Sequence, residues 1–90
     1  MQSKNKPAMT SRERAWVERV KSAPCAVCRT PGPSEAHEIK QGSWYTSIAL
    51  CQDCHRSQIL GIHGQKRAWL IAKMDELDAL NRTIEDICGA

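Results

Sequence analysis

Residues 25–28 (CAVC) and 51–54 (CQDC) are two C-x2-C units with 22 residues between them. In zinc-stabilised domains, such units form two knuckles that together supply a tetrahedron of thiolate ligands. Disulfide pairing is the competing use of paired cysteines, but the odd fifth cysteine, Cys88, and the lack of a signal-peptide pattern argue against it. We therefore expect one structural zinc ion, Zn2+, on Cys25, Cys28, Cys51 and Cys54.

The chain has 90 residues, the length of one small domain, and a domain of this size gains little stability from its core alone. Structural zinc contributes on the order of 10 kcal/mol that only the folded state receives. We predict a disordered basic arm at residues 1–9 and one zinc-stabilised domain at residues 10–90. Within this domain, residues 24–64 would form the metal-supported core and residues 65–88 the C-terminal helices.

The net charge is +3, with basic residues concentrated in the first third of the chain and acidic residues at the C-terminal end. This mild excess permits a polyanionic partner without requiring one. No apolar run approaches 18 residues, and no signal-peptide core follows Met1. We therefore expect a cytoplasmic protein that has no membrane partner.

Local patterns predict a helix before the first cysteine unit. Thr10 and Glu13 have the spacing of a capping box, so the helix is expected to run from residue 11 to about residue 21. Trp16, Val17 and Val20 would share its buried side.

The rest of the chain is predicted to alternate between short strands and helices, separated by segments rich in Gly, Pro and Ser. The expected strands span residues 34–40 and 44–50, and the expected helices span residues 51–60, 65–74 and 75–88. Apolar residues at helical spacing in the last helix predict a buried stripe of Leu77, Leu80, Ile84 and Ile87.

The three histidines of the chain all lie within or just after the stretch bounded by the cysteine units. His37 falls on the first predicted strand, His55 directly follows the second unit, and His63 stands in a Gly-Ile-His-Gly sequence. On an unbroken helix, His55 and His63 would point about 80° apart. We therefore predict that Gly61 ends the helix and that residues 61–64 form a loop that carries His63 back.

This order of features resembles the HNH, or ββα-metal, nucleases in their zinc-supported form. The segments 34–39 (SEAHEI), 48–55 (IALCQDCH), 61–64 (GIHG) and 75–80 (DELDAL) are similar to the phage recombination-enhancement (RecA-dependent) nuclease branch. The resemblance covers roughly residues 22–87. It implies a small α+β fold: a zinc-supported ββα-metal core with flanking N- and C-terminal helices.

The resemblance also implies an activity, namely metal-dependent DNA endonuclease cleavage of phosphodiester bonds in phage or prophage recombination. The protein would act in the cytoplasm of the bacterial host cell. Its partners would be DNA and a recombinase or other DNA-processing protein. A second, catalytic divalent ion, Mg2+ or Mn2+ in the family, would bind His37, His55 and His63. Imidazole ligands taken alone favour zinc, copper or nickel instead.

The sequence departs from the family pattern in three ways. The central Asn of HNH is absent, with Thr46 or Ser47 near its position, and the connection between His37 and Cys51 is short for this branch.

The third departure concerns the His-His or Asp-His pair that supplies the general base in the family. Here Glu38 follows His37. A carboxylate can take a proton from water, so Glu38 is a candidate base. It is equally a candidate surface charge, because successive strand residues face opposite sides. Four basic residues near the histidines are candidates for phosphate contacts: Lys40, Arg56, Lys66 and Arg67.

Two further functions stay open beside the nuclease. A non-catalytic zinc-stabilised DNA-binding module would bind DNA in a salt-dependent manner without cleaving it. A zinc-stapled protein-interaction adaptor would use the acidic C-terminal helix as its contact. A second bound metal would favour the nuclease, and absence of DNA affinity at low salt would favour the adaptor.

Overall fold

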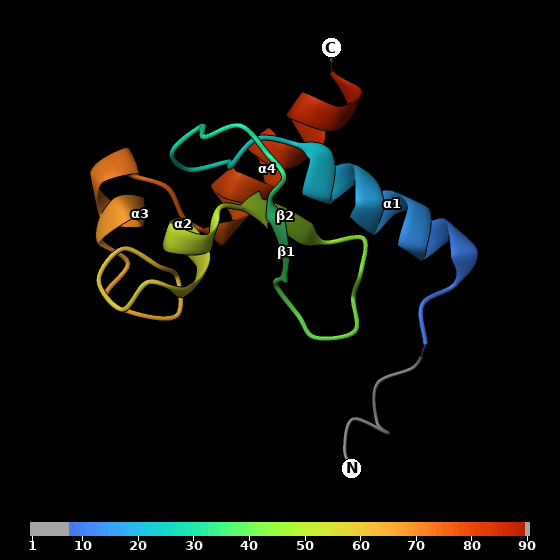
Figure 1. Cartoon of the computed structure of the whole chain (residues 1–90), viewed down its shortest axis with the longest axis horizontal. Helices are drawn as coiled ribbons and strands as arrows, with labels where there is room; N and C mark the ends of the chain where they lie inside the picture. The colour runs from blue at the N-terminus through green and yellow to red at the C-terminus, as the bar shows by residue number, and fades with distance from the viewer. Residues whose placement is uncertain (1–7, 90) are drawn as a thin grey trace.

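A computed structural model describes residues 8–89, so the predicted arm at residues 1–9 lies almost wholly outside the described part of the chain. The described elements build a small α+β domain with one two-stranded antiparallel sheet (Figure 1). They are α1 (Ser11–Ser22), β1 (Glu35–Glu38), β2 (Ser47–Leu50), α2 (Gln52–Arg56), α3 (Arg67–Ala72) and α4 (Glu76–Cys88). Over residues 8–89, none of these helices has the length and apolar character needed to cross a membrane.

Helix α1 begins at the predicted capping box. The Thr10 hydroxyl accepts from the Glu13 amide at 3.1 Å, and the Glu13 carboxylate accepts from the Thr10 amide at 2.8 Å. These two bonds satisfy amides that the first helical turn leaves without partners. Val17 and Val20 are buried, and Trp16 is partly buried beside them, so the predicted inner side of this helix is confirmed.

The sheet divides the core into two sides. His37 pairs with Ile48 in the antiparallel register, and the neighbouring β2 residue, Ala49, faces the opposite way. Ala49 packs with Val20 of α1, whereas Ile48 packs with Trp69 of α3. Figure 1 shows α1 on one side of the strands and α2 with α3 on the other. The alternation of strand residues thus turns His37 toward α2.

Both strands are shorter than predicted, because hydroxyl groups fold the connecting segment into turns. The Ser47 hydroxyl donates to the carbonyl of Trp44 at 2.6 Å, and the Thr46 hydroxyl donates to the carbonyl of Ser43 at 3.0 Å. Such local bonds compete with strand pairing. Of the predicted strand 44–50, only the last four residues pair with β1.

The predicted helix at 51–60 is also too long, since α2 ends at Arg56. The Ser57 hydroxyl accepts from the amides of Ile59 and Leu60, at 3.2 and 3.1 Å, and so begins a separate turn. The helix predicted at 65–74 is likewise shortened to α3, which is followed by Lys73 in the left-handed conformation (φ 58°).

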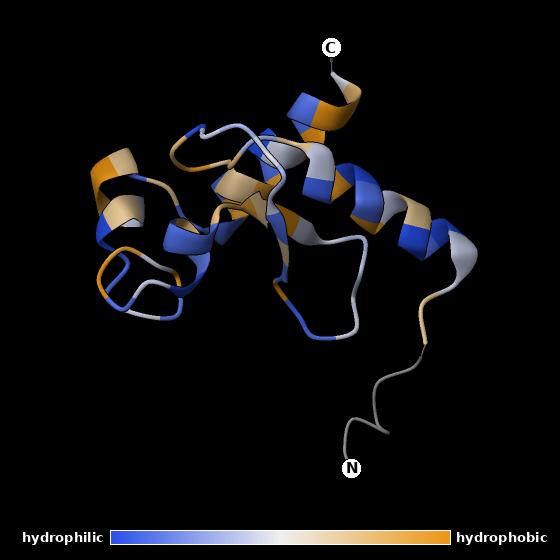
Figure 2. Cartoon of the chain, in the orientation of Figure 1, coloured by the Kyte–Doolittle hydropathy of each residue, from blue (hydrophilic) through white to orange (hydrophobic). Residues whose placement is uncertain are grey.

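The predicted buried stripe on α4 is only half right, because Leu80 and Ile87 pack partly buried against the core whereas the other two members, Leu77 and Ile84, are exposed. Hydrophobic and hydrophilic residues follow one another along this helix (Figure 2), but its fully buried residues are the small ones, Ala79 and Thr83. Leu77 is 70% exposed and Ile84 39% exposed. The small side chains on this face of α4 let the helix approach β2 closely. The Thr83 hydroxyl then accepts a hydrogen bond from the Ala49 amide at 3.1 Å.

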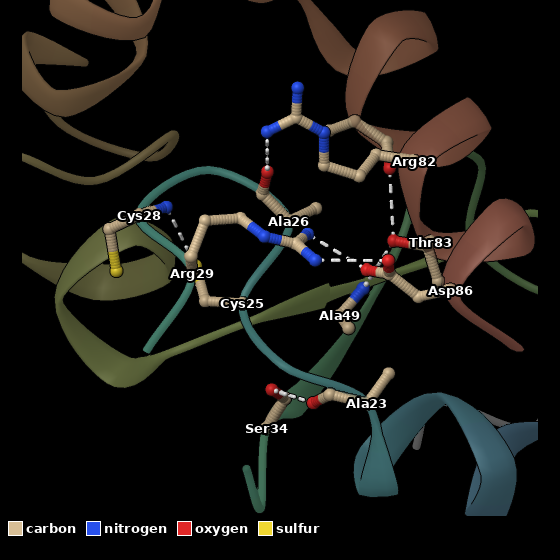
Figure 3. A network of polar contacts seen from close by, with 11 residues as sticks. Ala23, Cys25, Ala26, Cys28, Arg29, Ser34, Ala49, Arg82, Thr83 and Asp86 are labelled. Atoms are coloured by element: carbon tan, nitrogen blue, oxygen red, sulfur yellow. Dashed lines mark hydrogen bonds and ion pairs between the residues drawn. The ribbon is translucent and has the colours of Figure 1, made fainter. Parts of the chain in front are cut away.

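Polar contacts fasten the second half of α4 to the first cysteine unit, as Figure 3 shows. Arg29 and Asp86 form a two-pronged ion pair with bonds of 2.8 and 3.0 Å. Thr83 bonds β2 from the same helix. On the same outer edge of β2, the Ala49 carbonyl accepts a hydrogen bond from the Ala26 amide at 2.8 Å. The outer edge of the sheet is therefore covered by α4 and the first knuckle.

Candidate metal centres

The four predicted cysteines come together in one cluster, in which all Sγ atoms lie within 4.8 Å of one another. The sulfurs of Cys28 and Cys51 lie 3.6 Å apart, and all four cysteines are free of disulfides. In a tetrahedral zinc site with Zn–S bonds of about 2.3 Å, the sulfurs lie about 3.8 Å apart. The cluster thus fits zinc with little rearrangement.

Each cysteine unit has the local geometry of a knuckle. The Cys28 amide donates to the Cys25 sulfur at 3.5 Å, and the Cys54 amide donates to the Cys51 sulfur at 3.4 Å. Cys51 is at the same time the N-cap of α2, which places Cys54 in the first turn of that helix. The repeated three-residue spacing of the sequence therefore corresponds to a repeated amide-to-sulfur bond.

The protonation of the thiols reflects their crowding. Burial raises the pKa of Cys54 far above its ordinary value, and repulsion from Cys25 adds to this. Burial acts in the same direction on Cys28, but hydrogen bonds from Thr30 and Cys51 outweigh it and lower its pKa to about 7. Four thiolates together need a cation, and a tetrahedral set of four sulfurs suits zinc.

The three histidines form a second cluster. Their candidate ligand nitrogens lie within 4.8 Å of one another, and the ring centroids are 5.0–5.1 Å apart in every pair. His37 comes from β1, His55 from α2 and His63 from the loop after α2. His37 is buried, His55 is half-buried and His63 is exposed. The predicted convergence of the three side chains is thus present.

The loop that carries His63 depends on two glycines. A Cβ atom on Gly61 would lie 2.8 Å from the carbonyl oxygen of His55, and one on Gly64 only 2.2 Å from that of Gln58. These close approaches let the chain turn back on α2, where the His63 amide meets the His55 carbonyl at 3.4 Å. The predicted return of residues 61–64 toward α2 is confirmed, but the helix ends at Arg56 and not at Gly61.

Two carboxylates contact the histidine rings, one at His55 and one at His37. Glu35 Oε1 lies 2.7 Å from His55 Nδ1, and Glu76 Oε2 lies 2.6 Å from His37 Nε2. Histidines that bind metals commonly present one nitrogen to the ion and the other to such an acceptor. Sequence patterns do not single out either glutamate, because each meets its histidine from a distant part of the chain.

Glu35 is shared between His55 and Arg56. Arg56 donates from Nε to Oε1 at 3.1 Å and from Nη2 to Oε2 at 2.5 Å. Burial works to raise the pKa of Glu35, but the bonds from His55 and Arg56 hold it below its ordinary value. Arg56, predicted to contact DNA, therefore takes part in this ion pair while its side chain stays 59% exposed.

A small cavity of about 250 Å³ opens on the histidines. Glu38 lines it beside His37, and Glu38 Oε1 accepts from the Gly42 amide at 2.8 Å. The candidate base thus borders the same space as the histidines although it follows His37 directly in β1. The other three predicted phosphate contacts are exposed: Lys40, Lys66 and Arg67.

Burial and repulsion from the neighbouring His37 and His55 lower the pKa of His63. The neutral imidazole, which is the form that binds metals, therefore persists to lower pH than in a free histidine.

The two clusters meet on α2, where Cys54 and His55 are adjacent. The Cys54 carbonyl accepts from the Ile62 amide and from the Trp69 indole nitrogen, both at 2.9 Å. Ile62 precedes His63, so the same carbonyl anchors the histidine loop. The cysteine cluster thereby supports two of the three histidines through one short segment.

Comparison of the chain with protein-family models, with curated proteins and with solved structures finds no match. The functional assignment therefore rests on the residues and their geometry.

Proposed function

We propose that the protein is a metal-dependent DNA endonuclease of the HNH kind. Zinc on the cysteine cluster would support a ββα-metal core made of β1, β2 and α2, and a second divalent ion on the histidine cluster would serve phosphodiester hydrolysis. The observation that carries the proposal is the convergence of His37, His55 and His63 on a cavity next to four clustered cysteines. Three ligands beside open space leave a coordination position for water or substrate, as in hydrolytic metal sites.

The donor atoms fit a divalent transition ion at the histidine cluster. Imidazole suits zinc, nickel and copper, whereas magnesium and manganese favour oxygen ligands. We therefore propose nickel or zinc ahead of Mg2+ or Mn2+, the ions that the resemblance implies. When bound, the ion supplies charge neutralisation at the phosphate and the leaving oxygen.

Glu38 is the proposed general base. Glu38 lines the cavity beside His37, and its carboxylate accepts a hydrogen bond from the Gly42 amide. A carboxylate in this place can accept a proton from the attacking water. Lys40, Lys66 and Arg67 would contact phosphates on either side of the scissile bond.

The test is cleavage of single- and double-stranded DNA by the zinc-loaded protein, supplied in turn with Ni2+, Zn2+, Mn2+ or Mg2+. His37→Ala and His63→Ala are expected to lose cleavage with every ion, whereas the matched control Gln65→Ala, on the same exposed loop as His63, keeps it. His63→Ala is informative even if the buried His37 proves necessary for folding. Cleavage that persists unchanged in both histidine variants would refute the assignment.

A non-catalytic DNA-binding module is the second candidate, favoured by the bond that engages one Glu38 oxygen with Gly42. It would bind DNA with a salt-dependent affinity but would not cleave it with any of the ions. Absence of DNA affinity at low salt would instead support the adaptor.

A further inference from the structure

The contact between Glu76 and His37 joins the C-terminal helix to the histidine cluster across 39 residues of sequence. Glu76 Oε2 lies 2.6 Å from His37 Nε2, and the His37 side chain is only 9% exposed. A carboxylate accepts hydrogen bonds and cannot donate them when ionised, so the proton at this contact belongs to the imidazole nitrogen. In the neutral imidazole, the form that binds metals, this contact places the proton on Nε2 and leaves the lone pair on Nδ1.

Glu76 is held in place independently of His37. It is the first residue of α4, directly after an N-cap at which Asp75 and Asp78 exchange backbone-to-carboxylate bonds of 2.8 and 3.1 Å. Farther along the helix, Thr83 and Asp86 fasten α4 to β2 and to the first knuckle (Figure 3). The carboxylate therefore meets the ring from a helix whose position other contacts set.

We propose that Glu76 is a positioning residue of the histidine site, which fixes His37 as the Nε2–H tautomer and presents Nδ1 to the metal ion. Glu35 acts on His55 in the opposite sense: it bonds Nδ1 and leaves Nε2 for the ion. The site thus contains two histidines locked as different tautomers by carboxylates from different elements. This inference rests on the second metal site of the proposed function, but not on DNA cleavage.

The test uses full-length, zinc-loaded protein labelled with 15N-histidine, before and after addition of Ni2+. In the wild type without Ni2+, long-range proton–nitrogen spectra are expected to show His37 as the Nε2–H tautomer. Glu76→Ala should give a mixture of tautomers and an affinity for Ni2+ that is 10- to 100-fold lower, the usual effect of removing such a partner. Glu76→Gln, whose amide oxygen still accepts the Nε2–H, should keep the tautomer and lose less affinity.

Glu85→Ala is the matched control, because Glu85 is an exposed glutamate on the same helix, about 13 Å farther along its axis. It should change neither the tautomer nor the affinity. The proposal is overturned if Glu76→Ala leaves both unchanged, or if Glu85→Ala lowers the affinity as much. If Glu76→Ala does not fold, a Glu76→Gln protein with unchanged affinity and a His37 tautomer other than Nε2–H overturns it.

The two proposals fail in different ways. A protein that binds Ni2+ and shows the Glu76-dependent tautomer, yet never cuts DNA, would refute the endonuclease and keep the positioning role. A wild type that binds no second ion refutes the metal site, and the tautomer in the ion-free protein still decides whether Glu76 orients His37.

Discussion

The cysteine cluster and the histidine cluster share α2 but differ in enclosure and in their outer partners. Cys25 and Cys54 are buried, and four sulfurs close the ligand set around the expected ion. The histidine cluster has three members, includes the exposed His63, and opens on a cavity. Carboxylates orient His37 and His55, whereas backbone amides bond the cysteine sulfurs. The comparison teaches that a ligand set closed around its ion suits a structural metal, while a ligand set with an open position leaves room for a reactant.

Removal of a cysteine should therefore unfold the domain. Cys54→Ser takes one thiolate from the closed set, and the loss of zinc removes on the order of 10 kcal/mol from the folded state. Zinc content and far-ultraviolet circular dichroism measure the effect. Cys88→Ser, which changes the exposed cysteine outside the cluster, should keep both. A cooperatively folded, zinc-free Cys54→Ser protein would show that the cluster is not the source of stability.

Loss of the candidate base should act on the reaction alone. Glu38→Gln keeps an oxygen that can accept the Gly42 amide but cannot take a proton from water, so cleavage should slow by about 100-fold or more. Thermal unfolding and affinity for the second ion should stay at wild-type values. If the rate is unchanged, Glu38 is not the general base.

Disturbance of the histidine loop should weaken the open site and leave the closed one loaded. In Gly64→Ala the new methyl group would stand 2.2 Å from the Gln58 carbonyl oxygen, so the loop must shift and move His63. We expect about a tenfold loss of affinity for Ni2+ by calorimetry, with zinc still at one per chain. Gly42→Ala is the control for backbone strain outside the histidine loop, since Gly42 has a φ of +90° but a Cβ atom there would meet nothing within 4 Å. Equal losses in the two variants would contradict the loop account.

The smallest effect is expected at the exposed basic residues. Lys66→Ala should weaken DNA binding a few-fold and lower the slope of log affinity against log salt by about one, if Lys66 contacts a phosphate. Neither metal site should change. Fluorescence anisotropy at several salt concentrations measures the slope, and Lys73→Ala, on the far end of α3, serves as the comparison. An identical slope in wild type and Lys66→Ala would remove this residue from the interface.

Local signals in the sequence predict the two knuckles and the loop that carries His63, whereas the convergence of the three histidines is an expectation that comes from the family resemblance. Each C-x2-C unit forms its knuckle between residues three positions apart, and Gly61 and Gly64 allow the close turn that returns His63 to α2. The capping box at Thr10 likewise concerns residues three positions apart. In each of these places the pattern and the interaction lie within the same few residues, which is why sequence reasoning succeeds.

Contacts between distant segments are the part that the sequence does not predict. Glu35 and Glu76 are two of ten acidic residues, and only the packing of α2 and α4 against the sheet assigns them to histidines. The helical spacing of Leu77 and Ile84 favoured a buried stripe, yet α4 buries Thr83 instead. The reason is the Ala49 amide at the edge of β2, which needs an acceptor that only a polar residue can supply.

The division of labour between the clusters can be decided by titrating zinc-loaded, 15N-histidine-labelled protein with paramagnetic Ni2+. The account predicts that one equivalent broadens the ring signals of His37, His55 and His63 together, while zinc stays at one per chain on the cysteines. Ring signals that stay sharp, or Ni2+ uptake only as zinc is released, would contradict it.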